Sequence, residues 1–323
     1  MNQVTLSDVQ RAAARLNGVA HVTPVFTSSQ LNIAAGAAVF LKCENLQRVG
    51  AFKFRGAYNA VAALPPDRTA TPVVTLSSGN HAQGVALACR LLGRQAHVVM
   101  PGPVNALKRA ATITYGATVH EAADRQQGDR MLGALLEETS GVHIHAFNDP
   151  LVIAGQGTAM LEFLSVVPDL DVVLAPIGGG GLLSGACVAA HGVKPGLRIY
   201  ACEPIGALDA IQSVRENRIV PMTNPCTIAD GLRSSVGDMT LPILHAHLSG
   251  FFTVGEHEIV EAMRFAFERL KIVIEPSSAV ALAPVLRREP ALHDQRVGVL
   301  ITGGNVDLSA FFPTFLRKRE PAP

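Results

Sequence analysis

Residues 171–183 read Asp-Val-Val-Leu-Ala-Pro-Ile-Gly-Gly-Gly-Gly-Leu-Leu, an apolar run followed by four consecutive glycines and the start of a helical segment. The apolar run predicts a buried strand. Similar runs alternate with helical segments along the chain, at 73–76, 97–100, 117–120, 199–202 and 297–301. This alternation predicts an α/β fold with mainly parallel, twisted sheets flanked by helices on both faces.

Turn residues divide the chain into two predicted domains. Leu64-Pro65-Pro66-Asp67 and Asn148-Asp149-Pro150 interrupt the alternation. The length of 323 residues is about twice that of a typical domain. We therefore expect a small domain at 67–148, inserted in a large domain formed by 1–66 and 149–323.

Composition excludes several classes of protein. The chain is 48% hydrophobic with a net charge of +1, which excludes extended disorder and offers no basic surface for nucleic acid. No apolar run approaches the roughly 20 residues that span a bilayer. The N-terminus predicts a helix over 6–16 capped by Ser7, without the apolar core of a signal peptide. Five cysteines without a Cys-x-x-Cys pair favour a reduced, cytoplasmic protein.

The four glycines suggest a binding site for one phosphate. Glycines allow a ligand to approach the backbone, and free N–H groups at a helix N-terminus bind anions. The loop has neither the lysine of a nucleoside triphosphatase loop nor the spacing of a dinucleotide fingerprint. A tight strand-to-helix turn without a ligand is the alternative.

Lys53 is a candidate nucleophile. It lies between Phe52 and Phe54, and partial desolvation by these rings would lower the pKa of its amine. An aldehyde cofactor that carries a phosphate would form an imine with such a lysine. A lysine that extends along the surface into solvent is the alternative.

Four motifs occur in a characteristic order: Ala-Phe-Lys-Phe-Arg-Gly-Ala at 51–57, Ser-Ser-Gly-Asn-His-Ala-Gln-Gly at 77–84, the four glycines, and Thr-Gly-Gly-Asn-Val-Asp at 302–307. Together they resemble the pyridoxal-phosphate-dependent serine/threonine dehydratases of fold type II, the fold of the tryptophan synthase β subunit. Serine racemases and threo-3-hydroxyaspartate dehydratases are similar members. The resemblance runs from about residue 4 to about residue 316 and implies the short form without a regulatory domain.

The resemblance implies a role for each cofactor-binding position. Lys53 matches the Schiff-base lysine, and the aromatic ring of Phe52 matches one beside the cofactor ring. Asn80 matches the residue that binds the cofactor 3-hydroxyl, and Thr302 matches the hydroxyl that faces the pyridine nitrogen. The phosphate cradle is matched by Gly178, Gly179, Gly180 and Gly181. A neutral partner for that nitrogen makes the ring a weaker electron sink, which favours β-elimination over transamination.

The second motif implies the substrate site. At the predicted start of a helix, N–H groups and hydroxyls could hold the substrate carboxylate, and the motif supplies Ser77, Ser78, Asn80 and His81 there. Asn148 is a further candidate. Ser78 also matches the acid/base of serine racemases on the face opposite the lysine, which makes it a second catalytic candidate. Capping of the helix is the alternative role of the serines.

A metal site is implied by Glu203, Ala207 and Asp209. In relatives, two carboxylates, the alanine carbonyl and waters bind Mg²⁺, Ca²⁺ or Mn²⁺ at these positions, as suits hard cations. Two acids six residues apart are otherwise common on solvated faces.

Other positions bear on substrate choice. Ala51 replaces the serine of many dehydratases. Arg125 and Arg130 are candidate cations for a second substrate carboxylate. Pocket residues are also expected at Glu275, Ser234 and Ser235.

We therefore predict an ammonia-lyase that dehydrates a hydroxy-amino acid such as L-serine, L-threonine or threo-3-hydroxyaspartate to an oxo-acid and ammonia. An amino-acid racemase with dehydratase side activity is the alternative. A dinucleotide-dependent oxidoreductase and a non-catalytic binding protein are disfavoured by the glycine spacing and by Lys53. The expected partners are a small amino acid and a second copy of the chain in a homodimer, with no nucleic acid and no membrane.

Overall fold

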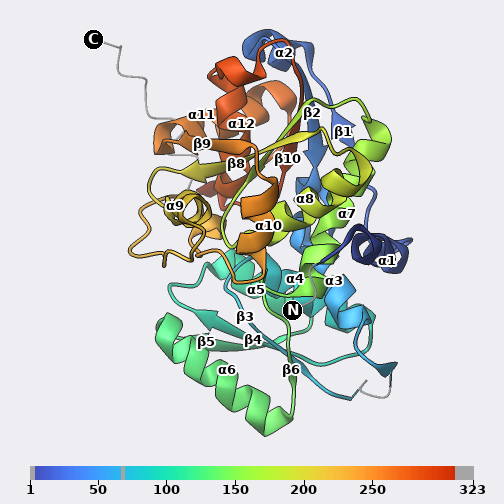
Figure 1. The fold of residues 1–323 in the computed structure, drawn as a ribbon. Coiled ribbons are helices and arrows are strands. Elements are labelled where there is room, and N and C mark those ends of the chain that lie inside the picture. Colours follow the sequence, from blue (N-terminus) through green and yellow to red (C-terminus); the bar gives the residue numbers. More distant parts are fainter. Residues whose placement is uncertain (1–3, 67–69, 310–323) are drawn as a thin grey trace.

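The computed structural model describes residues 4–66 and 70–309. Figure 1 shows two bodies, each built around a sheet, with the blue start of the chain and its second half, yellow to red, together in the upper one. Residues 67–69 and 310–323 of the predicted domains lie outside the described residues. The end of the resemblance, from residue 310 to about 316, lies outside them as well.

The larger sheet has six strands, and only its edge strand β1 is antiparallel to its neighbour. Its register places Val299 opposite both Leu41 and Leu174. The strands in spatial order are β1 (Val25–Phe26), β2 (Ala38–Cys43), β10 (Arg296–Ile301), β7 (Val172–Pro176), β8 (Arg198–Pro204) and β9 (Gly250–Val254).

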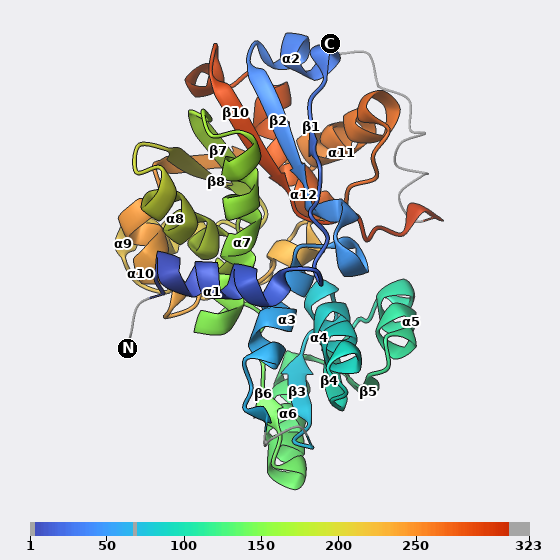
Figure 2. The same ribbon diagram turned by 90° about the vertical axis from the view of Figure 1, so that its right-hand side faces the viewer.

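Helices cover both faces of this sheet, so the central strands β7 and β10 are apolar on both sides. Val173 and Ala175 pack into one core and Val172 and Leu174 into the other. Figure 2 shows the first face covered by α1 (Leu6–Leu16), α7 (Pro150–Val166), α8 (Gly181–Val193) and α10 (Thr240–His247). The second is covered by α2 (Ser29–Ala35), α11 (Glu256–Phe265) and α12 (Pro276–Leu286). The sequence could predict this two-sided burial because its strand runs do not alternate with polar residues.

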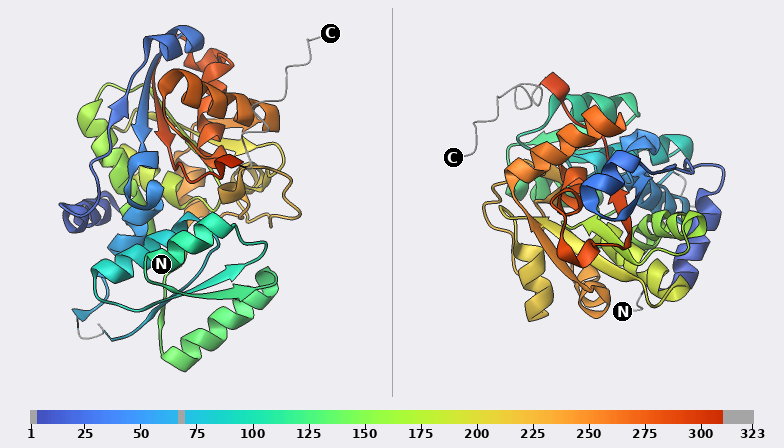
Figure 3. Two further views of the ribbon diagram at one scale, coloured as in Figure 1. Left: turned by 180° about the vertical axis from the view of Figure 1, so that it is seen from behind. Right: turned by 90° about the horizontal axis from the view of Figure 1, so that it is seen from above.

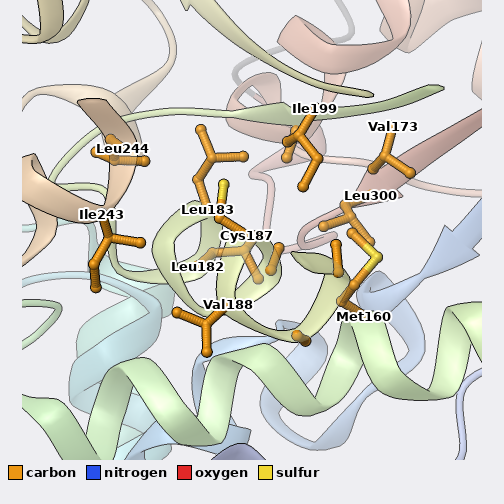
Figure 4. Close-up of a cluster of buried hydrophobic side chains, with 14 of the residues drawn as sticks. Met160, Val173, Leu182, Leu183, Cys187, Val188, Ile199, Ile243, Leu244 and Leu300 are labelled. Atoms are coloured by element: carbon orange, nitrogen blue, oxygen red, sulfur yellow. The ribbon is translucent and has the colours of Figure 1, made fainter. Parts of the chain in front are cut away.

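Helix α8 lies in the middle of the first core. Figure 4 shows Leu183 and Cys187 of α8 among Ile199 and Leu300 of the sheet and Leu244 of α10. Because the helix that follows the four glycines is enclosed on all sides, its N-terminus is fixed relative to the sheet.

The smaller sheet has four parallel strands in the order β5-β4-β3-β6. They are β5 (Thr118–Ala122), β4 (Ala96–Pro101), β3 (Val73–Leu76) and β6 (Val142–His143). Helix α6 (Arg125–Thr139) covers the outer face, and α4 (Asn80–Leu91) packs on the face toward the larger body together with α3 (Lys53–Ala62) (Figure 3). Helix α5 (Ala106–Thr114) packs beside α4.

All four strands lie inside the predicted small domain at 67–148. Helix α3 belongs by sequence to the predicted large domain, yet it packs against both α4 and α7. The apolar core of the small sheet therefore includes side chains from before residue 67, such as Phe54 and Val61. The division into 67–148 and the remainder stays a proposal.

Each of the six predicted strand runs overlaps an observed strand. The prediction missed β1, β2 and β9, whereas the alternating run at His143 and His145 corresponds to β6. The predicted cap Ser7 is wrong: α1 begins at Leu6, and its cap is Thr5. The Thr5 hydroxyl accepts from the backbone N–H of Asp8, and the Asp8 carboxylate accepts from the backbone N–H of Thr5, forming a capping box.

Within residues 4–66 and 70–309, no helix has both the length and the apolar character needed to cross a membrane.

Candidate active site

A cavity of about 620 Å³ lies between the two sheets. Its lining includes Ser77 after β3, Gly178 after β7 and Thr302 after β10. These are the carboxyl ends of parallel strands, where open α/β sheets bind ligands. The loops that the sequence singled out therefore meet around one space.

Lys53 is placed in this cavity by a short pairing between two motifs. The backbone N–H of Phe52 donates to the carbonyl of Thr302 at 3.0 Å, and Ala51 forms a β-bridge with Gly303. Helix α3 begins directly afterwards at Lys53. The first and last motifs are thus held together although about 250 residues separate them.

The Lys53 amine is buried beside an aromatic ring. Its Nζ donates to the carbonyl of Ala146 at 2.9 Å and lies 5.2 Å from the centroid of the Phe52 ring. Burial lowers the pKa of Lys53 to about 8, and the negative charge of Glu275 opposes this shift. An appreciable fraction of the amine is therefore neutral and nucleophilic near neutral pH.

The four glycines connect β7 to α8 and line the cavity. Gly180 has a φ of 88°, a conformation that favours glycine. A Cβ on Gly179 would lie 2.3 Å from the ring of Phe147. No hydrogen bond among the described residues uses the backbone N–H groups of these glycines. Free donors at the start of a 13-residue helix fit a phosphate group.

Asn80, the first residue of α4, is held from two sides. Its Nδ2 donates to Glu275 Oε1 at 2.8 Å, and its Oδ1 accepts from Asn305 Nδ2 at 2.9 Å. Burial raises the pKa of Glu275 to about 7, against the positive charge of Lys108. The sequence analysis gave no partner for Asn80, although Asn305 belongs to the last motif.

Thr302 is buried, and its hydroxyl lies 2.9 Å from the hydroxyl of Ser278. Ser278 Oγ also accepts from the backbone N–H of Gly303 at 2.6 Å. Sequence reasoning missed Ser278, because a serine at the start of a helix is common without any function.

Ser77, Ser78 and His81 also line the cavity. His81 Nε2 lies 3.2 Å from the carbonyl of Ile144, and the buried Nδ1 has no hydrogen-bond partner in the described part of the protein. Burial and the charge of Lys53 hold the pKa of His81 well below its usual range, so the ring is neutral.

Asn148 does not line the cavity within the described residues. Its Nδ2 donates to Asp238 Oδ1 at 2.6 Å, and its Oδ1 accepts from the backbone N–H of Met239 at 3.0 Å. Because both ends of the amide are occupied, we propose a structural role for Asn148 in place of substrate binding.

The candidate specificity residues separate into two groups. Arg125, Ser234 and Glu275 line the cavity, whereas Arg130, Ser235 and Ala51 are absent from the lining described for it. Ala51 is fully buried, so its missing hydroxyl leaves the cavity surface unchanged. Ser235 accepts from the backbone N–H of Met222.

The candidate metal ligands lie near the start of α9 (Asp209–Glu216). Glu203 accepts from the backbone N–H groups of Ala210 and Ile211 at 2.8 and 2.9 Å, whereas both buried carboxylate oxygens of Asp209 lack a partner among the described residues. Burial raises the pKa of Glu203 to about 8 and that of Asp209 to about 6. An unpartnered buried carboxylate fits a cation.

No group of three or more His, Cys, Asp or Glu side chains suited to a metal occurs in the described ranges. A cation at this position would therefore depend on the two carboxylates, the buried Ala207 and water.

Comparison with known proteins agrees with this geometry. The family model described as "Pyridoxal-phosphate dependent enzyme" matches residues 17–303. An L-threo-3-hydroxyaspartate ammonia-lyase of Pseudomonas sp is 45% identical over 307 residues, which are 94% of this chain and 96% of the relative. A serine racemase of Dictyostelium discoideum is 43% identical over 315 residues, 96% of this chain and 97% of the relative.

A solved structure of maize serine racemase has a TM-score of 0.93 at 38% identity and covers 97% of each chain. Neighbours of this kind share fold type II, which confirms the predicted fold class. The chain belongs to the family of pyridoxal-phosphate-dependent enzymes.

Proposed function

We propose that this protein is an ammonia-lyase that removes water from a hydroxy-amino acid and releases an oxo-acid and ammonia. The observation that carries the proposal is a half-buried lysine with a lowered pKa in the same cavity as a glycine loop with free N–H groups. The Pseudomonas relative, whose name states this reaction for hydroxyaspartate, supports it.

The cavity residues fit pyridoxal phosphate. Lys53 would hold its aldehyde carbon and Phe52 would pack beside its ring. Asn80 would bind the 3-hydroxyl, Thr302 would face the ring nitrogen, and the phosphate would be held by Gly178, Gly179, Gly180 and Gly181. When bound, the cofactor withdraws electrons from the substrate α-carbon.

The protein residues bind the substrate and move protons. We propose that the carboxylate of the amino acid is held by the N–H groups and hydroxyls at the start of α4, from Ser77, Ser78, Asn80 and His81. The Lys53 amine takes the α-proton, and the β-hydroxyl leaves as water after it receives a proton. The released enamine then takes up one water and gives the oxo-acid and ammonia. The neutral ring of His81 directs its Nε2–H at the carbonyl of Ile144, so Nδ1 is an acceptor and His81 would bind the carboxylate through its backbone N–H.

The position of Arg125 favours a substrate that carries a second carboxylate. It is the first residue of α6 and lines the cavity, and its Nε pairs with Asp129 at 3.1 Å. A guanidinium at this position can bind a carboxylate on the β-carbon. We therefore propose L-threo-3-hydroxyaspartate as the preferred substrate over L-serine and L-threonine.

The test is oxo-acid release from these three substrates by the wild type, Arg125→Met and Arg130→Met. Arg130 is a matched control, because it lies on the same helix but not among the residues that line the cavity. We expect Arg125→Met to raise KM for hydroxyaspartate about tenfold or more and to leave KM for serine almost unchanged. Equal losses for serine and hydroxyaspartate would contradict the substrate assignment, and no oxo-acid from any substrate would contradict the activity.

Racemisation is a second candidate, supported by Ser78. Its side chain lines the cavity, and the Dictyostelium relative is named a serine racemase. A second proton donor on the opposite face allows inversion, whereas elimination needs only one face. Chiral analysis of residual serine and aspartate tests this candidate: Ser78→Ala should abolish any racemisation and preserve most of the elimination.

Three further properties are part of the proposal. Mg²⁺, or Ca²⁺ or Mn²⁺, would bind Glu203, Asp209 and the carbonyl of Ala207, as the unpartnered Asp209 carboxylate suggests. A homodimer is supported by the low share of charged residues, 16%. A cytoplasmic location is supported by five cysteines that are all free, four of them buried.

A further inference from the structure

Lys108 forms an ion pair across the cavity with a residue far away in the sequence. It lies on α5, beside the smaller sheet, and its Nζ is 2.5 Å from Asp230 Oδ2. The side chain of Lys108 is 9% exposed and that of Asp230 is 44% exposed. Both residues line the cavity. One partner is thus almost buried while the other lies at the opening to solvent.

Each partner is anchored to its own body. The N-terminus of α5 is capped by Asn105, whose Oδ1 accepts from the backbone N–H groups of Leu107 and Lys108. On the other side, Asp230 begins a 3₁₀ turn (Asp230–Leu232), and the next residue, Gly231, donates its N–H to Ser277 Oγ of α12 at 3.0 Å. The ion pair therefore connects helix α5 to a turn that is fixed on the larger body.

The same turn also lies against the glycine loop. A Cβ on Gly178 would approach the Cα of Leu232 to 3.0 Å. Helix α4, which presents Asn80 and His81, packs against α5. A change in the distance between Lys108 and Asp230 would therefore move α5 and α4 relative to the glycine loop.

We propose that Lys108 and Asp230 are positioning residues: their ion pair holds the cavity in its closed form, with the start of α4 facing the glycine loop. This proposal deepens the function proposed above and rests on it where activity is concerned. An ion pair of this exposure contributes little enough to the closed form for the cavity to open for the substrate and to close again.

The pair is tested by hydrogen exchange on the cofactor-loaded protein without substrate. The variants are Lys108→Met, Asp230→Asn and the double exchange Lys108→Asp with Asp230→Lys. We expect either single change to speed backbone exchange in 106–114 and 230–232 about fivefold, as loss of one partly exposed ion pair allows. The double exchange should restore most of the protection, because it returns an ion pair with reversed direction.

Arg109→Met is the matched control. Arg109 is the next residue on α5, and its ion pair with Glu121 at 2.7 Å stays within the smaller body. The Arg109→Met variant should leave backbone hydrogen exchange in 230–232 at the wild-type rate. Unchanged exchange in both single variants, or an equal change in Arg109→Met, would overturn the proposal.

Kinetics give a second, separate readout. With hydroxyaspartate, the single variants should raise KM more than they lower kcat, because a cavity that is more often open holds the substrate less well. If the exchange results are as expected but neither the wild type nor any variant releases oxo-acid, the role of the ion pair is supported and the proposed reaction is contradicted. If the double exchange fails to recover both protection and KM, the positioning role is wrong.

Discussion

At the scale of single residues, the site depends on two groups whose charges are linked. Glu275 is buried and Lys53 is half-buried, and desolvation moves the pKa of each toward neutrality. Each charge also favours the charged form of the other. The low pKa of Lys53 is therefore the balance of desolvation against one nearby carboxylate.

The first prediction concerns cofactor capture. Free pyridoxal phosphate should react with the cofactor-free protein faster as pH rises through about 8, because only the neutral amine of Lys53 attacks an aldehyde. Glu275→Gln removes the charge that raises the pKa of Lys53, so its midpoint should lie at lower pH. Borohydride trapping and mass spectrometry at each pH measure the adduct.

The control for this experiment is Lys53→Ala, which should give no adduct at any pH. A wild-type midpoint near 10, the range of an exposed lysine, would contradict the desolvated environment.

Gly180 allows a second prediction at this scale. Gly180→Ala should weaken phosphate binding and cost about 1 kcal/mol or more of stability, because a side chain is strained at positive φ. The added Cβ would also lie 2.8 Å from Leu244 Cδ1. Titration with pyridoxal phosphate and thermal unfolding measure both effects, and Gly196→Ala, where a Cβ meets nothing within 4 Å, is the control.

At the scale of elements, the start of helix α3 is held by a buried network of charges. Arg55, two residues after Lys53, is fully buried and binds Glu44 at 2.7 Å and Glu162 at 2.7 Å. Glu162 also binds buried Lys42 at 2.7 Å. This network ties α3 to β2 and α7, so it fixes the direction in which Lys53 enters the cavity.

Removal of Arg55 should therefore lower the free energy of unfolding. Arg55→Met leaves buried Glu44 without a cation and takes one of two cations from Glu162, so it should destabilise the protein by roughly 3–5 kcal/mol. Denaturant unfolding measures this, with Arg11→Met as the control, since Arg11 is exposed and pairs only with nearby Asp8 and Ser7. A loss below about 1 kcal/mol would show that the network contributes little.

The contribution of this network to stability should decrease at low pH. Arg55 holds the pKa of buried Glu44 below its usual range, against the effect of burial. Such a group stabilises the fold above its unfolded pKa near 4.5, and this contribution is lost as pH falls through the lower folded value.

At the scale of the whole molecule, a cation at Asp209 should couple stability to pH. Without metal, the pKa of Asp209 is raised to about 6, so its folded form binds protons more tightly than the unfolded chain. Stability should then fall as pH rises from about 4 toward 6. A bound cation favours the charged carboxylate and removes this loss.

Mg²⁺ should therefore raise the melting temperature more at pH 8 than at pH 5, and chelation should reverse the effect. Asp209→Asn should abolish the response to Mg²⁺, whereas Asp294→Asn, an exposed acid elsewhere, should keep it. Equal Mg²⁺ responses in the wild type and Asp209→Asn would exclude this site.

The sequence by itself determined the α/β class, the six strand runs and the motifs around Lys53, because apolar periodicity and glycine placement are local properties. It missed the short β1, which has two residues, because such a run carries too little periodicity. Only the tertiary structure decided that the Asn148 amide is bound by Asp238 and Met239, that Arg125 belongs to the described lining of the cavity while Arg130 does not, and that Lys108 pairs with Asp230. These outcomes depend on how two sheets pack around one space, and contacts between residues 90 to 122 positions apart leave no local pattern.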